Sequence, residues 1–247
     1  MKNNINRTIW ISWKKTILAL TIYLMSIQMG MTQANTIGTT GKWGSQIFLS
    51  DVNGRAFENK YADITGSPYF FPAFKFSSIE MTDGRKYINI KAKINLVEQE
   101  VEFISASSQE GYIGKGLVSV ISFNDTVKQE IKKFTFQTGF PGIDNQTSIH
   151  FYQVLCNGKV TFLKSINKMI EERNNELSGE KSKDFVVREN WYVFQNGTMK
   201  RVKKEQSFFA SVFSDKTNPF ITYVKEQKVN FKNEEQLIKM IDYLNGL

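Results

Sequence analysis

The chain has 247 residues, a formal net charge of +8 and a hydrophobic content of 41 %, with 20 phenylalanines. This apolar content excludes an intrinsically disordered chain. The first 34 residues hold four basic residues and no acid, so the remainder carries a net charge of +4. That charge is scattered and does not form the basic stripe of a nucleic-acid binder, so we predict no nucleic-acid partner.

The first 34 residues have the three parts of a secretory signal peptide. A basic start is followed by an almost uncharged run over residues 16–31 and by small residues at Thr32 and Ala34. We predict cleavage between Ala34 and Asn35. A retained anchor is the alternative, although the run is shorter than the ~20 residues of a spanning helix. With Cys156 as its one cysteine, the exported chain would have no intramolecular disulfide.

After a flexible lead-in over residues 35–42, the sequence predicts a β-rich domain over residues 43–204. Apolar and polar residues alternate between turn signals, which is typical of half-buried strands. Asn157-Gly158 and Asn196-Gly197 each predict a hairpin between apolar-rich runs. Residues 178–184 are polar and predict a surface loop. The other expected strands cover residues 46–50, 87–96, 101–104, 117–123 and 131–136.

The last segment, residues 205–247, has a helical pattern. Short helices are predicted over residues 207–213 and from Asn218, which would cap a helix with Pro219 in its first turn. Asn233 begins a capping box before a third helix. The face of this helix that we expect to pack on the sheet comprises Leu237, Met240, Ile241 and Leu244. The predicted fold is therefore mainly β (α+β): an antiparallel meander forming a curved sheet, sandwich or half-barrel, with short C-terminal helices.

Catalytic and metal-binding side chains are scarce. The single histidine, His150, would lie ~20 Å from Cys156 if the two share a strand, which is too far for a nucleophile and its base. A zinc site needs several histidine or cysteine ligands. We therefore predict no catalytic residue, no metal ligand and no cofactor.

Three carboxylates, Glu98, Glu100 and Glu102, alternate along one expected strand and share a face. We interpret them as the solvated side of a sheet whose other side carries Val101 and Phe103. A glycosidase would instead hold two carboxylates ~5–9.5 Å apart in a cleft. A carboxylate-based glycan hydrolase is therefore one alternative function.

The densest aromatic segment covers residues 68–76, where two prolines interrupt the alternation of a central strand. One interpretation is a loop that plugs the open end of the sheet. The other is an interaction lip for an acyl chain, a glycan or a partner protein, because exposed aromatic patches are often interaction sites. The candidate lip residues are Tyr69, Phe70, Phe71 and Phe74.

Three stretches combine turns with the starts of strands. They are Gly66-Ser67-Pro68-Tyr69-Phe70, Asp83-Gly84-x-x-Tyr87-x-Asn89-Ile90 and Phe151-Tyr152-Gln153-Val154-Leu155-x-Asn157-Gly158-Lys159. In these, and in its C-terminal Glu234-x-x-Leu237, the chain resembles a family of uncharacterised exported, signal-peptide-bearing proteins of Bacteroidetes-type bacteria. The resemblance implies the periplasm or outer envelope of a two-membrane bacterium. It also implies O-glycosylation at Thr126, in Asp125-Thr126-Val127, where a plain turn is the alternative.

The leading functional expectation is an exported, non-catalytic cell-envelope protein that binds a partner protein or a surface component. A periplasmic carrier of a lipid or acyl group is the second alternative. The carrier needs an empty apolar groove of at least ~300 Å³. Its lining would come from the side chains expected to point inward, Ile88, Ile90, Ala92, Ile94 and Leu96.

Overall fold

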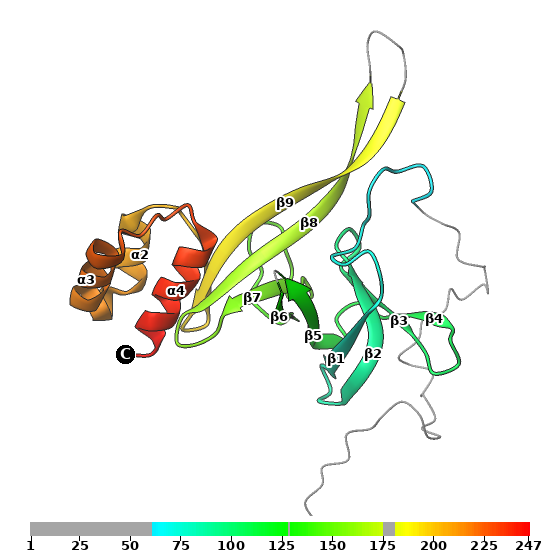
Figure 1. Ribbon diagram of the computed structural model, residues 1–247, viewed down its shortest axis with the longest axis horizontal. Coiled ribbons are helices and arrows are strands. Elements are labelled where there is room, and N and C mark those ends of the chain that lie inside the picture. Colours follow the sequence, from blue (N-terminus) through cyan, green and yellow to red (C-terminus); the bar gives the residue numbers. More distant parts are fainter. Residues whose placement is uncertain (1–60, 128, 175–180) are drawn as a thin grey trace, which may run out of the picture. The chain divides into compact units, whose positions relative to one another are not determined.

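The computed structural model describes residues 61–127, 129–174 and 181–247 (Figure 1). Three predictions fall outside the described residues. They are the signal peptide with cleavage between Ala34 and Asn35, the lead-in over residues 35–42 and the strand over residues 46–50.

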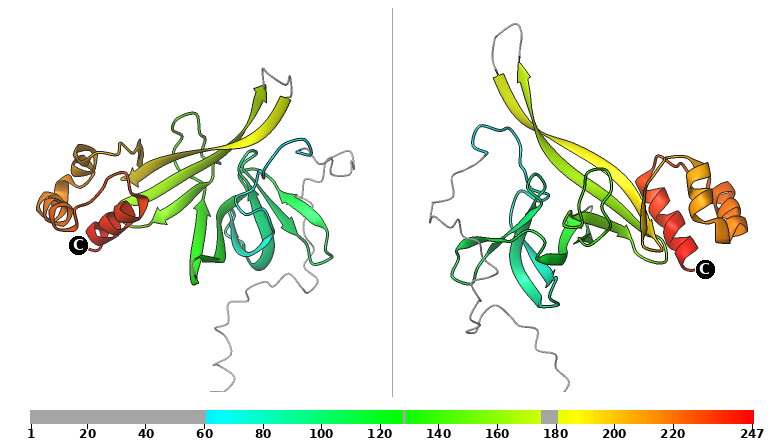
Figure 2. Two further views of the ribbon diagram at one scale, coloured as in Figure 1. Left: turned by 45° about the horizontal axis from the view of Figure 1, so that its top comes forward. Right: turned by 180° about the vertical axis from the view of Figure 1, so that it is seen from behind.

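The described chain forms one antiparallel sheet, followed by short helices. The strands are β1 (Lys75–Met81), β2 (Lys86–Asn95), β3 (Glu100–Ile104), β4 (Glu110–Ile113), β5 (Val118–Val127), β6 (Glu130–Gln137), β7 (Tyr152–Cys156), β8 (Thr161–Asn174), β9 (Lys181–Gln195) and β10 (Thr198–Arg201). The sheet is curved and unclosed (Figures 1 and 2), with the strand order β10-β9-β8-β7-β6-β5-β1-β2-β3-β4. The predicted fold class, mainly β with a curved antiparallel sheet and short C-terminal helices, is confirmed. The strand order departs from a simple meander at one point, where β5 pairs with β1 and not with β4.

A β-bulge in β2 corrects one set of predicted inward positions. Ser77 of β1 pairs with Ile90 and Ser78 pairs with Ile88, so Asn89 has no partner in β1 and adopts a φ of 58°. An extra residue reverses the side-chain alternation. Ile88 is therefore 38 % exposed and not inward as expected. The other four expected positions, Ile90, Ala92, Ile94 and Leu96, are buried in the main hydrophobic core.

Both Asn-Gly hairpins form as predicted. β7 and β8 flank Asn157-Gly158, and β9 and β10 flank Asn196-Gly197, where both residues have positive φ angles of 51° and 73°. Positive φ at both central residues is the geometry that asparagine and glycine tolerate in a two-residue hairpin turn. The loop expected over residues 178–184 is wrong in part, because β9 begins at Lys181.

The sheet buries apolar residues on both faces. The main core lies between the curved strands β1–β6 and the start of the described chain. A second core packs β7, β8 and β9 against the helices through residues such as Phe162 and Val193. A third core lies on the other side of these strands, around Tyr152, Leu163 and Tyr192. β7 and the parts of β8 and β9 that lie beside it are therefore covered on two sides.

The helices are α2 (Gln206–Val212), the short 3-10 helix η2 (Ser214–Lys216), α3 (Thr217–Gln227) and α4 (Glu234–Asn245). Asn218 is not the cap that we expected, because η2 leads directly into α3 and places Asn218 inside its first turn. Asn233 does cap α4, since its Oδ1 accepts the N–H of Gln236 at 3.0 Å. The predicted apolar face of α4 is buried in the second core.

Candidate functional site

The aromatic segment lies in residues 61–74, which we call the strap. Strap residues 68–70 run beside the end of β2, where the N–H of Phe70 donates to the carbonyl of Ile94 and the N–H of Leu96 donates to that of Pro68. Further back, the N–H of Thr65 donates to the carbonyl of Lys183, and the N–H of Phe185 donates to Thr65. The strap therefore joins the end of β2 to the edge of β9.

The four candidate lip residues are half-buried and lie in two groups. The rings of Phe70 and Phe71 pack on the main core, with ring centroids 4.8 Å from Phe136 and 5.6 Å from Phe123 respectively. The rings of Tyr69 and Phe74 instead surround the ammonium of Lys93. The four side chains thus do not form one aromatic patch, and their role as an interaction lip stays a prediction.

A buried ion pair lies beneath Tyr69. The Nζ of Lys93 is 3.0 Å from Glu102 Oε2, and it lies 3.8 Å and 4.3 Å from the ring centroids of Tyr69 and Phe74. The Tyr69 hydroxyl donates to the same Glu102 oxygen at 3.0 Å. Burial, with the Glu102 hydrogen bond and negative charge, raises the pKa of Tyr69, so this phenol stays protonated. The cluster holds the strap to β2 and β3.

This cluster corrects the interpretation of the three carboxylates. Glu102 is only 4 % exposed, so its side of β3 is not solvated as we expected. The side chain of Tyr69 covers it. Glu98 and Glu100 are paired with Lys115 at 3.5 Å and 3.4 Å. Val101 and Phe103 lie in the main core, as expected. Each of the three acids therefore has a lysine partner.

A buried serine forms the second polar cluster. Ser165 Oγ is 2.9 Å from His150 Nε2, 2.8 Å from Gln146 Nε2 and 3.2 Å from Asn167 Nδ2. The two amide nitrogens can only donate, so they occupy both lone pairs of the hydroxyl oxygen. The hydroxyl must then donate its proton to Nε2 of His150, which is therefore the unprotonated nitrogen of the ring.

This serine–histidine pair resembles a nucleophile with its base, but its surroundings oppose catalysis. Both lone pairs of Ser165 are occupied, and its side chain has no exposed surface. Burial also lowers the pKa of His150 to about 4, so the imidazole is uncharged at neutral pH. The arrangement positions the loop between β6 and β7 on β8.

His150 makes stability depend on pH. Its pKa is about 4 in the folded protein and 6.5 in an unfolded chain, so between these values only the unfolded state binds the proton. The contribution of neutral His150 to the free energy of unfolding is therefore present above pH 6.5 and decreases as the pH falls toward 4. From pH 7 to pH 5 we expect a loss of roughly 2 kcal/mol in the free energy of unfolding, measured by urea titration.

The control for this expectation is His150→Gln, which keeps an acceptor for Ser165 but does not titrate. Its loss of stability from pH 7 to pH 5 should be about 2 kcal/mol smaller than that of the unchanged protein. Because the chain has one histidine, no second imidazole confuses the comparison. Equal pH dependence in the two proteins would contradict a buried neutral His150.

Cys156 does not lie with His150. Its sulfur is 3.7 Å from Asp242 Oδ1 and 3.6 Å from Asn245 Nδ2, both on α4. Burial and the charge of Asp242 raise the pKa of the Cys156 thiol to about 11. The thiol is therefore protonated and unreactive at neutral pH.

β8 and β9 extend beyond the strands beside them. β7 pairs with β8 only as far as Ser165, and β10 pairs with β9 only from Tyr192 onward, whereas the β8–β9 ladder continues to the pair of Asn174 and Lys181. Residues 167–174 and 181–188 thus form a two-stranded ribbon, which we call the arm (Figure 1).

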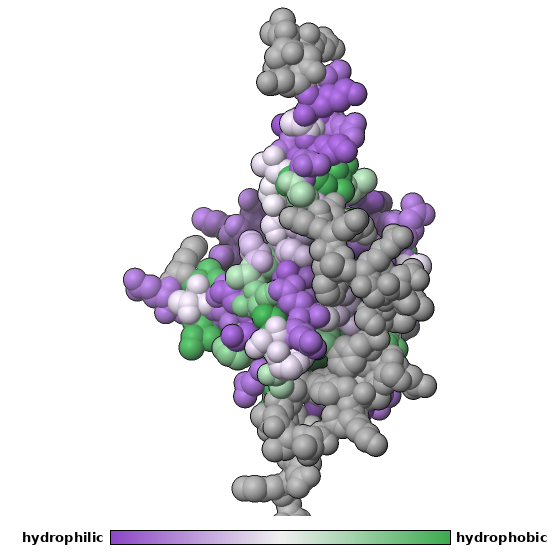
Figure 3. Space-filling model, turned by 90° about the vertical axis from the view of Figure 1, so that its right-hand side faces the viewer, coloured by the Kyte–Doolittle hydropathy of each residue, from purple (hydrophilic) through white to green (hydrophobic). Residues whose placement is uncertain are grey.

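The arm exposes aliphatic side chains on both faces. Met169, Ile170 and Val187 are 48 %, 42 % and 49 % exposed. The register puts Ile170 and Val187 on one face and Met169 on the other. In Figure 3 the outer part of this projection is hydrophilic, and hydrophobic side chains gather where it meets the rest of the described chain.

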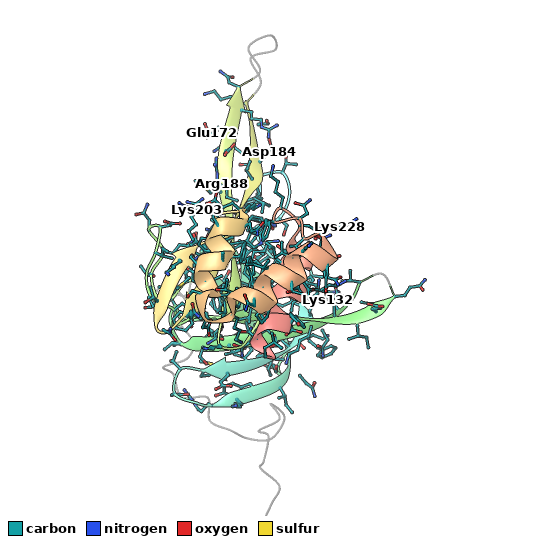
Figure 4. The ribbon with its side chains drawn as sticks, turned by 90° about the vertical axis from the view of Figure 1, so that its left-hand side faces the viewer. Lys132, Glu172, Asp184, Arg188, Lys203 and Lys228 are labelled. Atoms are coloured by element: carbon teal, nitrogen blue, oxygen red, sulfur yellow. The ribbon has the colours of Figure 1, made fainter. Side chains whose placement is uncertain are left out.

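Charged side chains pair across the arm. Arg188 contacts Glu171 at 2.8 Å, Lys183 contacts Glu172 at 3.2 Å and Arg173 contacts Asp184 at 3.7 Å. Figure 4 shows Glu172, Asp184 and Arg188 along the arm. The opposite charges largely neutralise one another, so the aliphatic side chains are the feature that distinguishes this surface.

Neither polar cluster nor the arm was predicted as a site. Ser165 is a small polar residue in a strand with many polar residues, and its partners come from the loop before β7 and from Asn167. The pairing of Lys93 with Glu102 had a possible signal, since both residues alternate with buried apolar neighbours. Thr126 is exposed in β5, paired with Ile131, and its O-glycosylation stays a prediction.

Residues 61–127, 129–174 and 181–247 contain no cluster of three or more potential metal-ligating histidine, cysteine, aspartate or glutamate side chains. Within the same ranges, no helix is both long and apolar enough to span a membrane. No family model, no curated protein and no solved structure matches the chain.

Proposed function

We propose that the protein is an exported, non-catalytic cell-envelope protein whose arm binds a partner protein. The observation that carries this proposal is the exposure of Met169, Ile170 and Val187 on a ribbon that extends past its neighbouring strands. The predicted aromatic lip is the alternative binding surface. Its side chains are less available to a partner, because some pack on the main core and the others on Lys93.

A partner protein would stabilise the arm, because a two-stranded ribbon with exposed aliphatic side chains has few stabilising contacts in water. A two-stranded ribbon has few partners and is marginally stable by itself. Exposed aliphatic side chains add no stability until another surface covers them. The ion pairs along the arm and the bonds of Thr65 to Lys183 and Phe185 hold it in place. A partner protein that covers the aliphatic side chains would gain the hydrophobic contribution, about 25 cal/mol per Å² of buried area.

The proposed compartment is the periplasm or outer envelope of a two-membrane bacterium. Its support is the signal-peptide pattern of residues 1–34 and the resemblance to exported proteins of Bacteroidetes-type bacteria. The mature protein should therefore begin at Asn35 in intact mass spectrometry. Replacing Ala34 by arginine should block cleavage, because a signal peptidase requires a small residue there. An unshortened mass for the unchanged protein would favour a retained anchor.

Photo-crosslinking in cells tests the binding role. Benzoylphenylalanine at Val187 should yield one discrete adduct with a second protein in the envelope. The matched control is the same substitution at Ile221 on α3, which is 50 % exposed against 49 % for Val187. We expect no such adduct from Ile221. Identical adduct patterns from the two positions, or none from Val187, would contradict partner binding by the arm.

A further inference from the structure

The arm has an open backbone edge along β8. The N–H of Lys168 points away from β9, because it donates to the carbonyl of Leu96 at 3.2 Å. Backbone groups of successive strand residues point to opposite edges. The N–H and C=O groups of Ile170, Glu172 and Asn174 therefore also point away from β9, and no described strand pairs with them.

The opposite edge of the arm supports this geometry independently. In β9, the carbonyl of Lys183 and the N–H of Phe185 point outward, because both bond to Thr65. Odd-numbered residues of β9 thus face away from β8. The register pairs Met169 with Val186, so odd residues of β8 face even residues of β9 across the ladder. The bonds of Thr65 to β9 and the bond of Lys168 to Leu96 thus both assign the even-numbered residues of β8 to its outward edge.

Both edges of the arm already hydrogen-bond backbone from other parts of this chain. The N–H of Lys168 in β8 donates to Leu96, in the turn between β2 and β3, and Thr65 forms a parallel bridge at Asp184 of β9. Beyond Lys168, the same edge of β8 has three further residues whose backbone N–H and C=O groups point outward, Ile170, Glu172 and Asn174. These groups lie next to the exposed side chains of Met169 and Ile170.

We propose that residues 170–174 of β8 bind an extended segment of the partner protein, which adds to the arm as a further strand. The proposal rests on the proposed function and names its mode of recognition. Main-chain hydrogen bonds give such strand addition its affinity, and flanking side chains give it selectivity. Here the flanking side chains are Met169 and Ile170, so the segment carries aliphatic residues opposite them and has no proline.

The test uses a defined probe, the heptapeptide acetyl-Lys-Thr-Val-Thr-Val-Thr-Lys-amide, titrated into the isotope-labelled mature protein. Amide signals of Ile170, Glu172 and Asn174 should shift in NMR spectra, and those of the β4 and β10 edges should not. Glu172→Pro removes one outward N–H and no β8–β9 bond, so we expect about tenfold weaker binding. Glu172→Gln loses the same ion pair with Lys183 but keeps the N–H, and it should bind like the unchanged protein.

Several results would overturn strand addition. These are the absence of shifts at millimolar peptide, shifts confined to β4 and β10, and equal binding by the two Glu172 variants. Peptide-independent shifts that grow with protein concentration would assign the edge to a second copy of this chain, against the proposal. A Val187 crosslink together with any of these outcomes would leave partner binding intact but place it on the side chains. Loss of that crosslink would instead remove the proposed function.

Discussion

Replacement of Lys93 by methionine is expected to lower the free energy of unfolding by about 3–5 kcal/mol. The reason is that Glu102, only 4 % exposed, would stay buried without the ammonium that lies 3.0 Å from it. The Tyr69 hydrogen bond would remain, but it does not neutralise the carboxylate. Urea unfolding followed by tryptophan fluorescence measures the change.

Two controls separate the buried pair from a general effect of charge. The double variant with Lys93→Met and Glu102→Leu removes both charges, so it should lose less stability than the single variant. Lys183→Met breaks an exposed ion pair on the arm, with Glu172, and should cost less than about 1 kcal/mol. A loss below 1 kcal/mol for Lys93→Met itself would contradict the buried-pair account.

Truncation of Ile241 to alanine should cost about 2–5 kcal/mol, because this side chain has no exposed surface and fills the core between α4 and the sheet. Undocking of α4 would also uncover Cys156, which contacts Asp242 and Asn245. The rate of Cys156 labelling by a maleimide should therefore rise together with the loss of stability.

The matched control is Ile221→Ala on α3, where the same truncation removes atoms that are half exposed. It should change stability by less than about 0.5 kcal/mol and leave the labelling rate of Cys156 unchanged. If Ile241→Ala behaved like this control, α4 would not be an integral part of the folded domain.

Local signals explain which elements could be predicted from the sequence. The hairpin at Asn196-Gly197 depends on two residues that tolerate positive φ, and α4 depends on the Asn233 cap and a regular apolar face. Both signals reside within a few neighbouring residues. Most neighbouring strands of the sheet follow one another in the sequence, but β5 pairs with β1, and no local signal indicates this pairing.

The remaining features depend on contacts distant in sequence. Glu100 and Glu102 alternate along β3 and share a face, whereas Glu98 lies in the turn before it. The burial of Glu102 requires Tyr69, 33 residues earlier. The bulge at Asn89 inserts one residue without interrupting the apolar pattern, so the alternation alone places Ile88 on the wrong side.

The arm was missed for a different reason. Strand prediction depends on alternation between a buried and a solvated face. The outer arm has solvent on both faces, so polar residues occupy both, and its strand structure comes from ladder pairing and cross-strand ion pairs. Residues 181–184 therefore have the composition of a loop although they lie in β9.

Cysteine footprinting tests partner binding by the arm most directly. Cys156 gives little background because burial raises its pKa to about 11. Val187→Cys and Ile221→Cys, at sites of nearly equal exposure, should react at similar rates with a maleimide in the purified protein. In intact envelopes we predict at least tenfold slower labelling at Val187 and no change at Ile221. Equal labelling at both positions in the envelope would contradict the account.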